Sequence, residues 1–167
     1  MPHDAPEQLL YVVNRDDYVI GSVRWGGAYN DPQVIHRAIC VIVINNNRML
    51  FKERGSEGSY PNFWALSCVG HVPYGVSYRE AAEHELDQEL NIKSPIFLVT
   101  KLLIKTDREA DFVEIYTTHT DNAEVAFDQE KFVDINWVDI KLIADFTETH
   151  QVIPADEYIL KQLMYIN

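Results

Sequence analysis

The chain has 167 residues, of which 47% are hydrophobic and 24% are charged, so its composition is that of one globular domain rather than a disordered or fibrous protein. Its 14 Lys and Arg against 26 Asp and Glu give a net charge of −12 without any basic cluster, which argues against a nucleic-acid polymer as partner. No apolar run approaches the roughly 20 residues of a membrane span. We therefore expect a soluble, cytoplasmic protein without a membrane partner.

The N-terminal part of the chain is typical of β-hairpins. One hairpin is expected from Leu9 to Val23, within an N-terminal extension that covers residues 1–33. A second is expected where residues 34–44, rich in β-branched side chains, lead through three asparagines into the strand-like run RMLFKER. A polar loop from Gly55 to Asn62 follows, and the apolar residues from Phe63 to Val72 predict a strand.

One helix of the middle region has clear ends. Ser77 and Glu80 form the sequence pattern of a capping box, which predicts that the helix begins at Ser77. Apolar residues recur every four positions along it, and Asn91 is suited to the left-handed conformation that ends many helices.

The C-terminal half alternates strands with short helices. Strands are expected over residues 96–105, 111–119 and 131–138, and helices over residues 139–146 and from Pro154 onward. Cys40 and Cys68 lie inside apolar runs, and we interpret them as buried free thiols. Hairpins outnumber crossovers, which favours a mixed sheet with helices on its faces.

Two carboxylates on the middle helix are candidates for chemistry. Glu85 and Glu89 are four residues apart, so they are neighbours on one helical face and repel each other unless a cation lies between them. We expect both to project away from Leu86. A solvated helix face is the alternative interpretation of this pair.

Residues 70–92, GHVPYGVSYREAAEHELDQELNI, resemble the Nudix box, G-x5-E-x7-R-E-U-x-E-E-x-G-U with U aliphatic. The register is fixed by Gly70, Glu85, Leu86, Glu89 and Ile92. The segments that flank the box also resemble those of the MutT-like Nudix superfamily. They include Pro61 and Trp64 before the box and FVDINWVDIKLI after it. The resemblance implies one α+β domain over residues 1–167, an α/β/α sandwich around a mixed sheet with the N-terminal hairpin added.

The box is degenerate at four positions. Val76 replaces the first Glu, His84 the Arg, Gln88 one of the paired Glu residues, and Asn91 the second Gly. An amide cannot act as a base and is a weak ligand for a hard cation, so we expect weak activity.

The resemblance also implies roles for individual residues. Glu85, Gln88 and Glu89 take the catalytic positions, and a Mg²⁺ or Mn²⁺ cofactor would be bound by the Gly70 carbonyl, Glu85, Glu89 and an extra strand carboxylate, Glu114. The substrate would be a small-molecule diphosphate.

The upstream segment is similar to the Nudix branch that includes isopentenyl-diphosphate isomerase. His36 and His71 match histidines of the isomerase's metal site, whereas Tyr29 stands where another histidine is expected. All three are candidates for substrate binding, although a buried structural role is the favoured interpretation of His36 and His71. The isomerase has a cysteine directly before its Gly-His pair, and here that position is Val69.

Three functions are open at this point. The first is a hydrolase of a nucleoside diphosphate linked to another group. The second is a catalytically silent module that binds a nucleotide or a protein, and the third is an isomerase of the kind just named. A homodimer is a further expectation.

Overall fold

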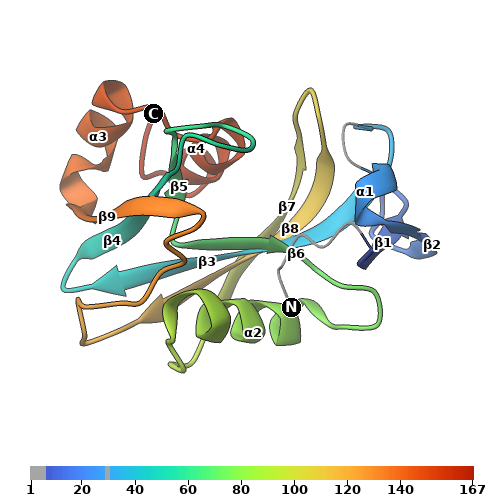
Figure 1. Ribbon diagram of the computed structural model, residues 1–167, viewed down its shortest axis with the longest axis horizontal. Helices are drawn as coiled ribbons and strands as arrows, with labels where there is room; N and C mark the ends of the chain where they lie inside the picture. The colour runs from blue at the N-terminus through green and yellow to red at the C-terminus, as the bar shows by residue number, and fades with distance from the viewer. Residues whose placement is uncertain (1–6, 29–30) are drawn as a thin grey trace.

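The computed structural model describes residues 7–28 and 31–167 (Figure 1). Its strands are β1 (Leu9–Val13), β2 (Val19–Arg24), β3 (Ile35–Asn45), β4 (Arg48–Arg54), β5 (Trp64–Leu66), β6 (Cys68–His71), β7 (Phe97–Lys105), β8 (Ala110–His119) and β9 (Phe132–Asp139). Its helices are α1 (Trp25–Ala28), α2 (Tyr78–Leu90), α3 (Ile143–Thr149) and α4 (Pro154–Gln162), and a 3₁₀ turn, η1 (Ile140–Leu142), precedes α3.

Strand β3 is the centre of a mixed sheet. It runs parallel to β8 and antiparallel to β1, β4 and β6, while β7 extends the sheet beyond β8 and β9 pairs with β4. Eight of the eleven residues from Ile35 to Asn45 are buried apolar side chains, because β3 is covered on both faces. This arrangement confirms the expected α+β fold.

The two large clusters of the core lie on opposite faces of the sheet, and a small third cluster is formed by Val13, Ile35 and Ala110. Ile39, Val41 and Val43 of β3 pack with the buried side of α2, whereas Cys40, Ile42 and Ile44 pack with α3 and α4. Figure 1 shows α2 on one side of the sheet and the two C-terminal helices on the other. Alternate residues of one strand thus hold together three layers, as the α/β/α sandwich requires.

Helix α2 begins and ends where the sequence predicts. The Ser77 side chain accepts from the Glu80 N–H while Glu80 accepts from the Ser77 N–H, which completes the capping box. Asn91 follows the helix with a φ of 51°, in the left-handed region. The start of α2 is therefore fixed relative to the loop that leads from β6.

The single strand expected from Phe63 to Val72 is wrong, because the structure divides it at Ser67. Before Ser67 the chain pairs with β4, and after it with β3. The Ser67 hydroxyl accepts from the Val43 N–H and donates to the Leu50 carbonyl, so it satisfies backbone groups where the chain changes partner. The change directs β6 and its last residue, His71, along β3.

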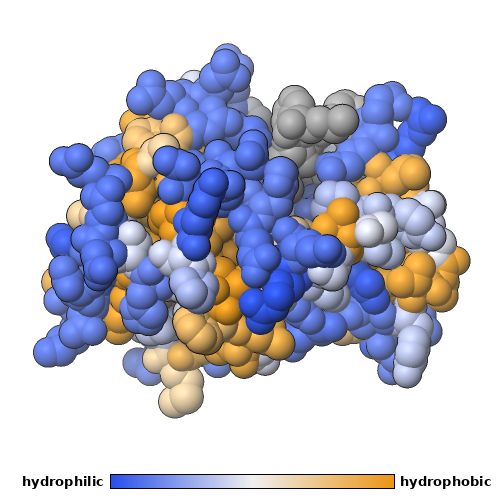
Figure 2. All heavy atoms as spheres, turned by 90° about the horizontal axis from the view of Figure 1, so that it is seen from below, coloured by the Kyte–Doolittle hydropathy of each residue, from blue (hydrophilic) through white to orange (hydrophobic). Residues whose placement is uncertain are grey.

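The surface on the α2 side mixes hydrophilic and apolar residues, and apolar groups lie near its middle as well as at the end where the β1–β2 hairpin lies (Figure 2). Val19 and Ile20 of this hairpin are exposed to 45% and 66%. Among the described residues, none of the helices combines the length and the apolar character that a membrane crossing requires. The homodimer stays a prediction.

Candidate metal centre and substrate pocket

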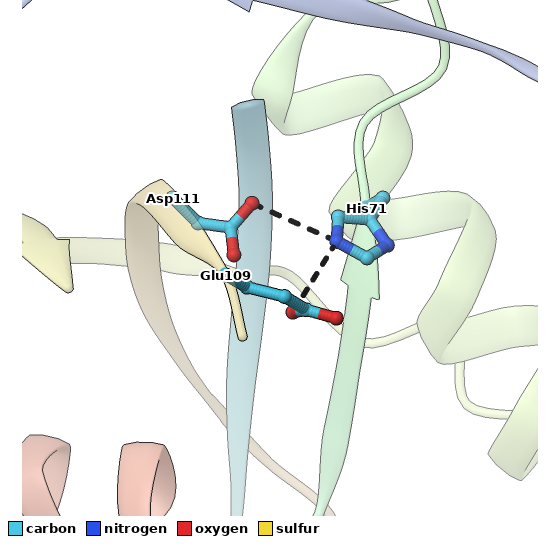
Figure 3. A group of neighbouring side chains, drawn as sticks. All are labelled: His71, Glu109 and Asp111. Carbon is cyan, nitrogen blue, oxygen red and sulfur yellow. Dashed lines mark ion pairs between the residues drawn. The ribbon is translucent and has the colours of Figure 1, made fainter. Parts of the chain in front are cut away.

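A cluster of one histidine and two carboxylates lies where β6 ends and β8 begins (Figure 3). His71 is the last residue of β6, Asp111 is in β8, and Glu109 lies just before that strand. Strand β3 pairs with both β6 and β8, and its residues Ala38 and His36 are the register partners of His71 and Asp111. The sheet itself therefore brings the cluster together.

The three side chains converge on one point. The Nε2 atom of His71 lies 3.6 Å from Oδ1 of Asp111 and 3.8 Å from Oε2 of Glu109. One ligand atom from each residue lies within 4.8 Å of the other two, which is a spacing that a single cation can bridge. Among the residues that the structure describes, no other group of three or more His, Cys, Asp and Glu side chains has this spacing.

Two buried polar atoms near the cluster support a bound cation. Asp111 is 8% exposed, and its Oδ1 has no hydrogen-bond partner among the residues that the structure describes. His36 is 3% exposed, and its Nδ1 lies 2.9 Å from the Tyr11 carbonyl. In the neutral tautomer that donates from Nδ1 to this carbonyl, Nε2 carries the lone pair. That Nε2 likewise has no hydrogen-bond partner in the described chain. Buried polar atoms in this state are typical of ligand and ion sites.

Trp25 selects one tautomer of the neutral His71 ring. Its indole Nε1–H donates to Nδ1 of His71 over 3.2 Å, so the neutral imidazole carries its proton on Nε2, facing the carboxylates. A cation at Nε2 requires the proton to move to Nδ1, which breaks the Trp25 hydrogen bond. His71, Glu109 and Asp111 therefore fit a divalent cation once this bond opens.

We predict that Trp25→Phe strengthens Mn²⁺ binding by about 2- to 10-fold, because the competing hydrogen bond is worth about 0.5–1.5 kcal/mol. Isothermal titration calorimetry measures the change. Trp137→Phe, which removes an indole that donates to the Ala123 carbonyl on the surface, is the matched control. Weaker Mn²⁺ binding by Trp25→Phe would show that Trp25 supports the site instead of competing with it.

The cluster opens into a cavity of about 480 Å³. His71, Glu109 and Asp111 line it together with three cationic side chains, Lys52, Arg54 and Arg108. Trp25, Tyr60 and Phe132 add aromatic surface. The Arg108 guanidinium lies over the Tyr60 ring at 5.3 Å, and Nε of Arg54 has no hydrogen-bond partner within the described residues. The pocket thus combines ligand atoms for a cation with groups that attract anions.

Only some of the residues expected at the site line this pocket. Gly70, His71 and Glu89 do. Gln88 is exposed on α2 and is not among the lining residues. Tyr29 lies outside the described residues.

The expectation that Glu85 projects away from Leu86 and the apolar side of α2 is wrong. Glu85 is 0% exposed and belongs to the buried side of the helix, together with Leu86 and Ala82. Consecutive residues of a helix are separated by about 100°, so the stripe that packs on β3 and β6 is wide enough to include position 85. Its role as a cation ligand stays a prediction.

Glu114 lies away from the cluster. Successive β8 side chains alternate between the faces of the sheet, and Glu114 shares its face with Tyr116 of the α2-side core, whereas Asp111 shares the opposite one with Val113. Its carboxylate lies 3.2 Å from Nζ of Lys101 and accepts a hydrogen bond from the Tyr116 hydroxyl. Glu114 is therefore held by these residues and not by the other candidate ligands.

The cysteines are buried free thiols, as expected. Cys40 and Cys68 are both 0% exposed, and burial raises the pKa of each thiol well above its ordinary value. Val69, the position that is cysteine in the isomerase, is 39% exposed and lines the pocket. The thiol thus lies on the other side of β6 from the pocket.

Asp156 adds a buried acid to the pocket wall. Burial raises the pKa of its carboxyl to about 6, although the Leu66 N–H donates to Oδ2 over 2.8 Å and Lys52 and Arg54 act in the opposite sense. An acid whose pKa is raised on folding contributes most to stability below pH ~4, and this contribution is lost as the pH rises through about 6.

Asp156→Asn keeps an acceptor for Leu66 but cannot ionise. We expect this variant to gain up to about 3 kcal/mol relative to wild type at pH 8, from a shift of about two pKa units, and nothing at pH 4. Urea unfolding at both pH values measures this, with the exposed neighbour Glu157→Gln as control. An equal loss of stability at both pH values would contradict it.

Comparisons with known proteins agree with the fold. A family model described as NUDIX domain matches residues 34–162. The uncharacterised Nudix hydrolase all7351 of Nostoc sp. is 24% identical over 165 residues, 96% of this chain and 97% of that protein. Isopentenyl-diphosphate delta-isomerase idi1 of Aspergillus fumigatus is 31% identical over 107 residues, 53% of this chain but only 38% of the fungal protein.

A solved structure gives the same result. The crystal structure of DR0079 from Deinococcus radiodurans superimposes with a TM-score of 0.79 at 18% identity, over 93% of this chain and 98% of that one. At this identity the likeness shows the fold alone. With the family match, the chain belongs to the Nudix superfamily.

Five pocket residues were not predicted from the sequence: Glu109, Asp111, Lys52, Arg54 and Arg108. A signal for the first two is present: they alternate around Ala110 at the start of a strand, so both face the same side. Their partner His71 is 38 positions or more away, and only the pairing of β3 with β6 and β8 brings it near.

Proposed function

We propose that this protein is a divalent-cation-dependent hydrolase of the phosphoanhydride bond in a nucleoside diphosphate linked to another group, or in a similar diphosphate. One observation carries the proposal: the His71–Glu109–Asp111 cluster opens into the pocket that Lys52, Arg54 and Arg108 also line. A diphosphate needs both kinds of group, because a chain with a net charge of −12 repels it without cations.

The pocket residues have different roles in the proposed reaction. His71, Glu109 and Asp111 would hold Mg²⁺ or Mn²⁺, which, when bound, polarises a phosphoryl oxygen and lowers the pKa of a coordinated water. Arg54 and Arg108 neutralise phosphate oxygens and orient the diphosphate, because a planar guanidinium can donate two parallel hydrogen bonds. The group linked to the diphosphate would bind in the aromatic part of the pocket, where Tyr60 and Phe132 offer flat apolar surface.

A specific observation favours a second candidate, the isomerase reaction. The rings of His36 and His71 lie 6.4 Å apart at the cluster, where the isomerase resemblance predicts metal-binding histidines. Against it, Val69 replaces the cysteine of the isomerase and the nearby Cys68 thiol is buried with a raised pKa. An apolar valine cannot transfer a proton, so the hydrolase remains the first candidate.

A panel assay separates the candidates. Purified protein is incubated with Mg²⁺ or Mn²⁺ and with nucleoside diphosphate derivatives or isopentenyl diphosphate, and products are followed by phosphorus and proton NMR. We expect metal-dependent phosphoanhydride cleavage, slower than the ~1–10³ s⁻¹ of typical enzymes because the box is degenerate. Double-bond migration without cleavage would replace the proposal with the isomerase. Binding without turnover, seen as a shift in melting temperature, would replace it with the silent module.

A further inference from the structure

Lys52 is a buried lysine beside the Nudix-box helix. It lies in β4, is 1% exposed, and its Nζ is 2.6 Å from Oε2 of Glu89. The same Nζ lies 4.0 Å above the Phe132 ring, a cation–π contact. A buried ammonium is stable only when it is paired, and the Glu89 carboxylate and the Phe132 ring are partners of this kind for Lys52.

This pair conflicts with a divalent cation at the box. The carboxylate of Glu89 is already shared with one cation, and a divalent ion beside it would also repel the Lys52 ammonium. The other box positions do not compensate, because Val76 is apolar and Gln88 is neutral and exposed. That leaves Glu85, which is wholly buried on the core side of α2, and the neutral Gly70 carbonyl, so the box offers one negative charge where Glu109 and Asp111 offer two. The box residues of this chain therefore do not fit a divalent cation.

We propose that the Lys52 ammonium takes the place of the divalent cation at the box carboxylate Glu89, and that this chain binds its divalent cation only at His71, Glu109 and Asp111. The inference deepens the proposed function at the same pocket and rests on it for the second half. Lys52 then serves two purposes, since it neutralises Glu89 and presents a fixed positive charge to an anionic ligand in the pocket.

Manganese titrations followed by electron paramagnetic resonance test both halves without any substrate. We expect wild type to bind one Mn²⁺ per chain. Glu89→Gln should leave that affinity within 2-fold, whereas His71→Ala should weaken it by at least 10-fold. Lys52→Met, which keeps an unbranched apolar stem without the charge, should gain a second Mn²⁺. The second ion should disappear in the Lys52→Met/Glu89→Gln double variant, and Lys52→Arg should bind one Mn²⁺ like wild type.

The outcomes distinguish the two proposals. A loss of 10-fold or more in Mn²⁺ affinity in Glu89→Gln, or a Lys52→Met protein that still binds only one Mn²⁺, would overturn the role of Lys52. An unchanged affinity in His71→Ala would overturn the location of the cation that the proposed function uses. Binding of Mn²⁺ through His71 shows that each box variant is folded. The Glu89→Gln variant tests the box without altering Lys52.

Discussion

Asp111→Asn is expected to lower divalent-cation affinity and cation-dependent hydrolysis by about 100-fold or more. The substitution keeps the shape of the side chain but removes its charge, and loss even of groups that only support metal ligands costs about 10- to 100-fold. Asp111 is 8% exposed and its Oδ1 lies 3.6 Å from Nε2 of His71, so the structure holds its carboxylate at the cluster. Calorimetry with Mn²⁺ and steady-state kinetics measure the two effects.

Asp107→Asn is the matched control, because Asp107 is an exposed carboxylate in the same β7–β8 turn. It should leave both cation affinity and hydrolysis within 2-fold of wild type. Hydrolysis by Asp111→Asn at the wild-type rate would mean that the cluster is not the catalytic cation site.

Asp17→Asn is expected to destabilise the protein by about 1–2 kcal/mol at pH 7, because hydrogen bonds to a charged group are worth about 1.5–3 kcal/mol and the partly exposed Lys101 partner lowers this value. Asp17 lies in the β1–β2 turn and accepts hydrogen bonds from Arg37 and Lys101, both over 2.7 Å, and from Tyr78 over 3.0 Å. These contacts join the N-terminal hairpin to β3, β7 and α2. Asn tolerates the φ of 62° at this position, so the loss reports charge and not backbone strain.

The effect depends on pH in a defined direction. Burial alone raises the pKa of Asp17, but hydrogen bonds from Lys101, Arg37 and Tyr78 outweigh it and the pKa is lowered. The stability that Asp17 supplies is therefore present above pH ~4 and is lost as the pH falls through its folded-state pKa. Urea unfolding should show the wild type and Asp17→Asn curves converging in acid, whereas Asp16→Asn, an exposed neighbour, should match wild type throughout. A difference that persists unchanged at pH 2 would contradict the electrostatic explanation.

The sequence predicts local structure well where side chains act on their own backbone. Ser77 and Glu80 cap α2, and Asn91 ends it, because these effects involve residues within one or two turns. The break at Ser67 could not be predicted in this way. Its cause is a change of pairing partner from β4 to β3, which depends on residues far away in the chain.

The site was harder to predict than the fold for the same reason. The Nudix-box resemblance led to Glu89 and Gly70, which do line the pocket, but Lys52 looked like an ordinary charged residue of a hairpin strand. Only the packing of α2 on the sheet shows that its ammonium meets Glu89. The carboxylates Glu109 and Asp111 become candidate cation ligands only because His71 lies beside them, brought there by the pairing of β6 and β8 with β3.

We propose that the divalent cation of this Nudix protein lies at the His71–Glu109–Asp111 cluster and not at the box helix. Crystals soaked with MnCl₂ and a methylene-bridged diphosphate analogue, which cannot be hydrolysed, give an anomalous difference map that locates Mn²⁺ directly. We predict a peak bonded to Nε2 of His71 and to the carboxylates of Glu109 and Asp111, with the analogue bound to the same ion. A peak bonded to Glu85 and Glu89, with Lys52 displaced, would contradict the account.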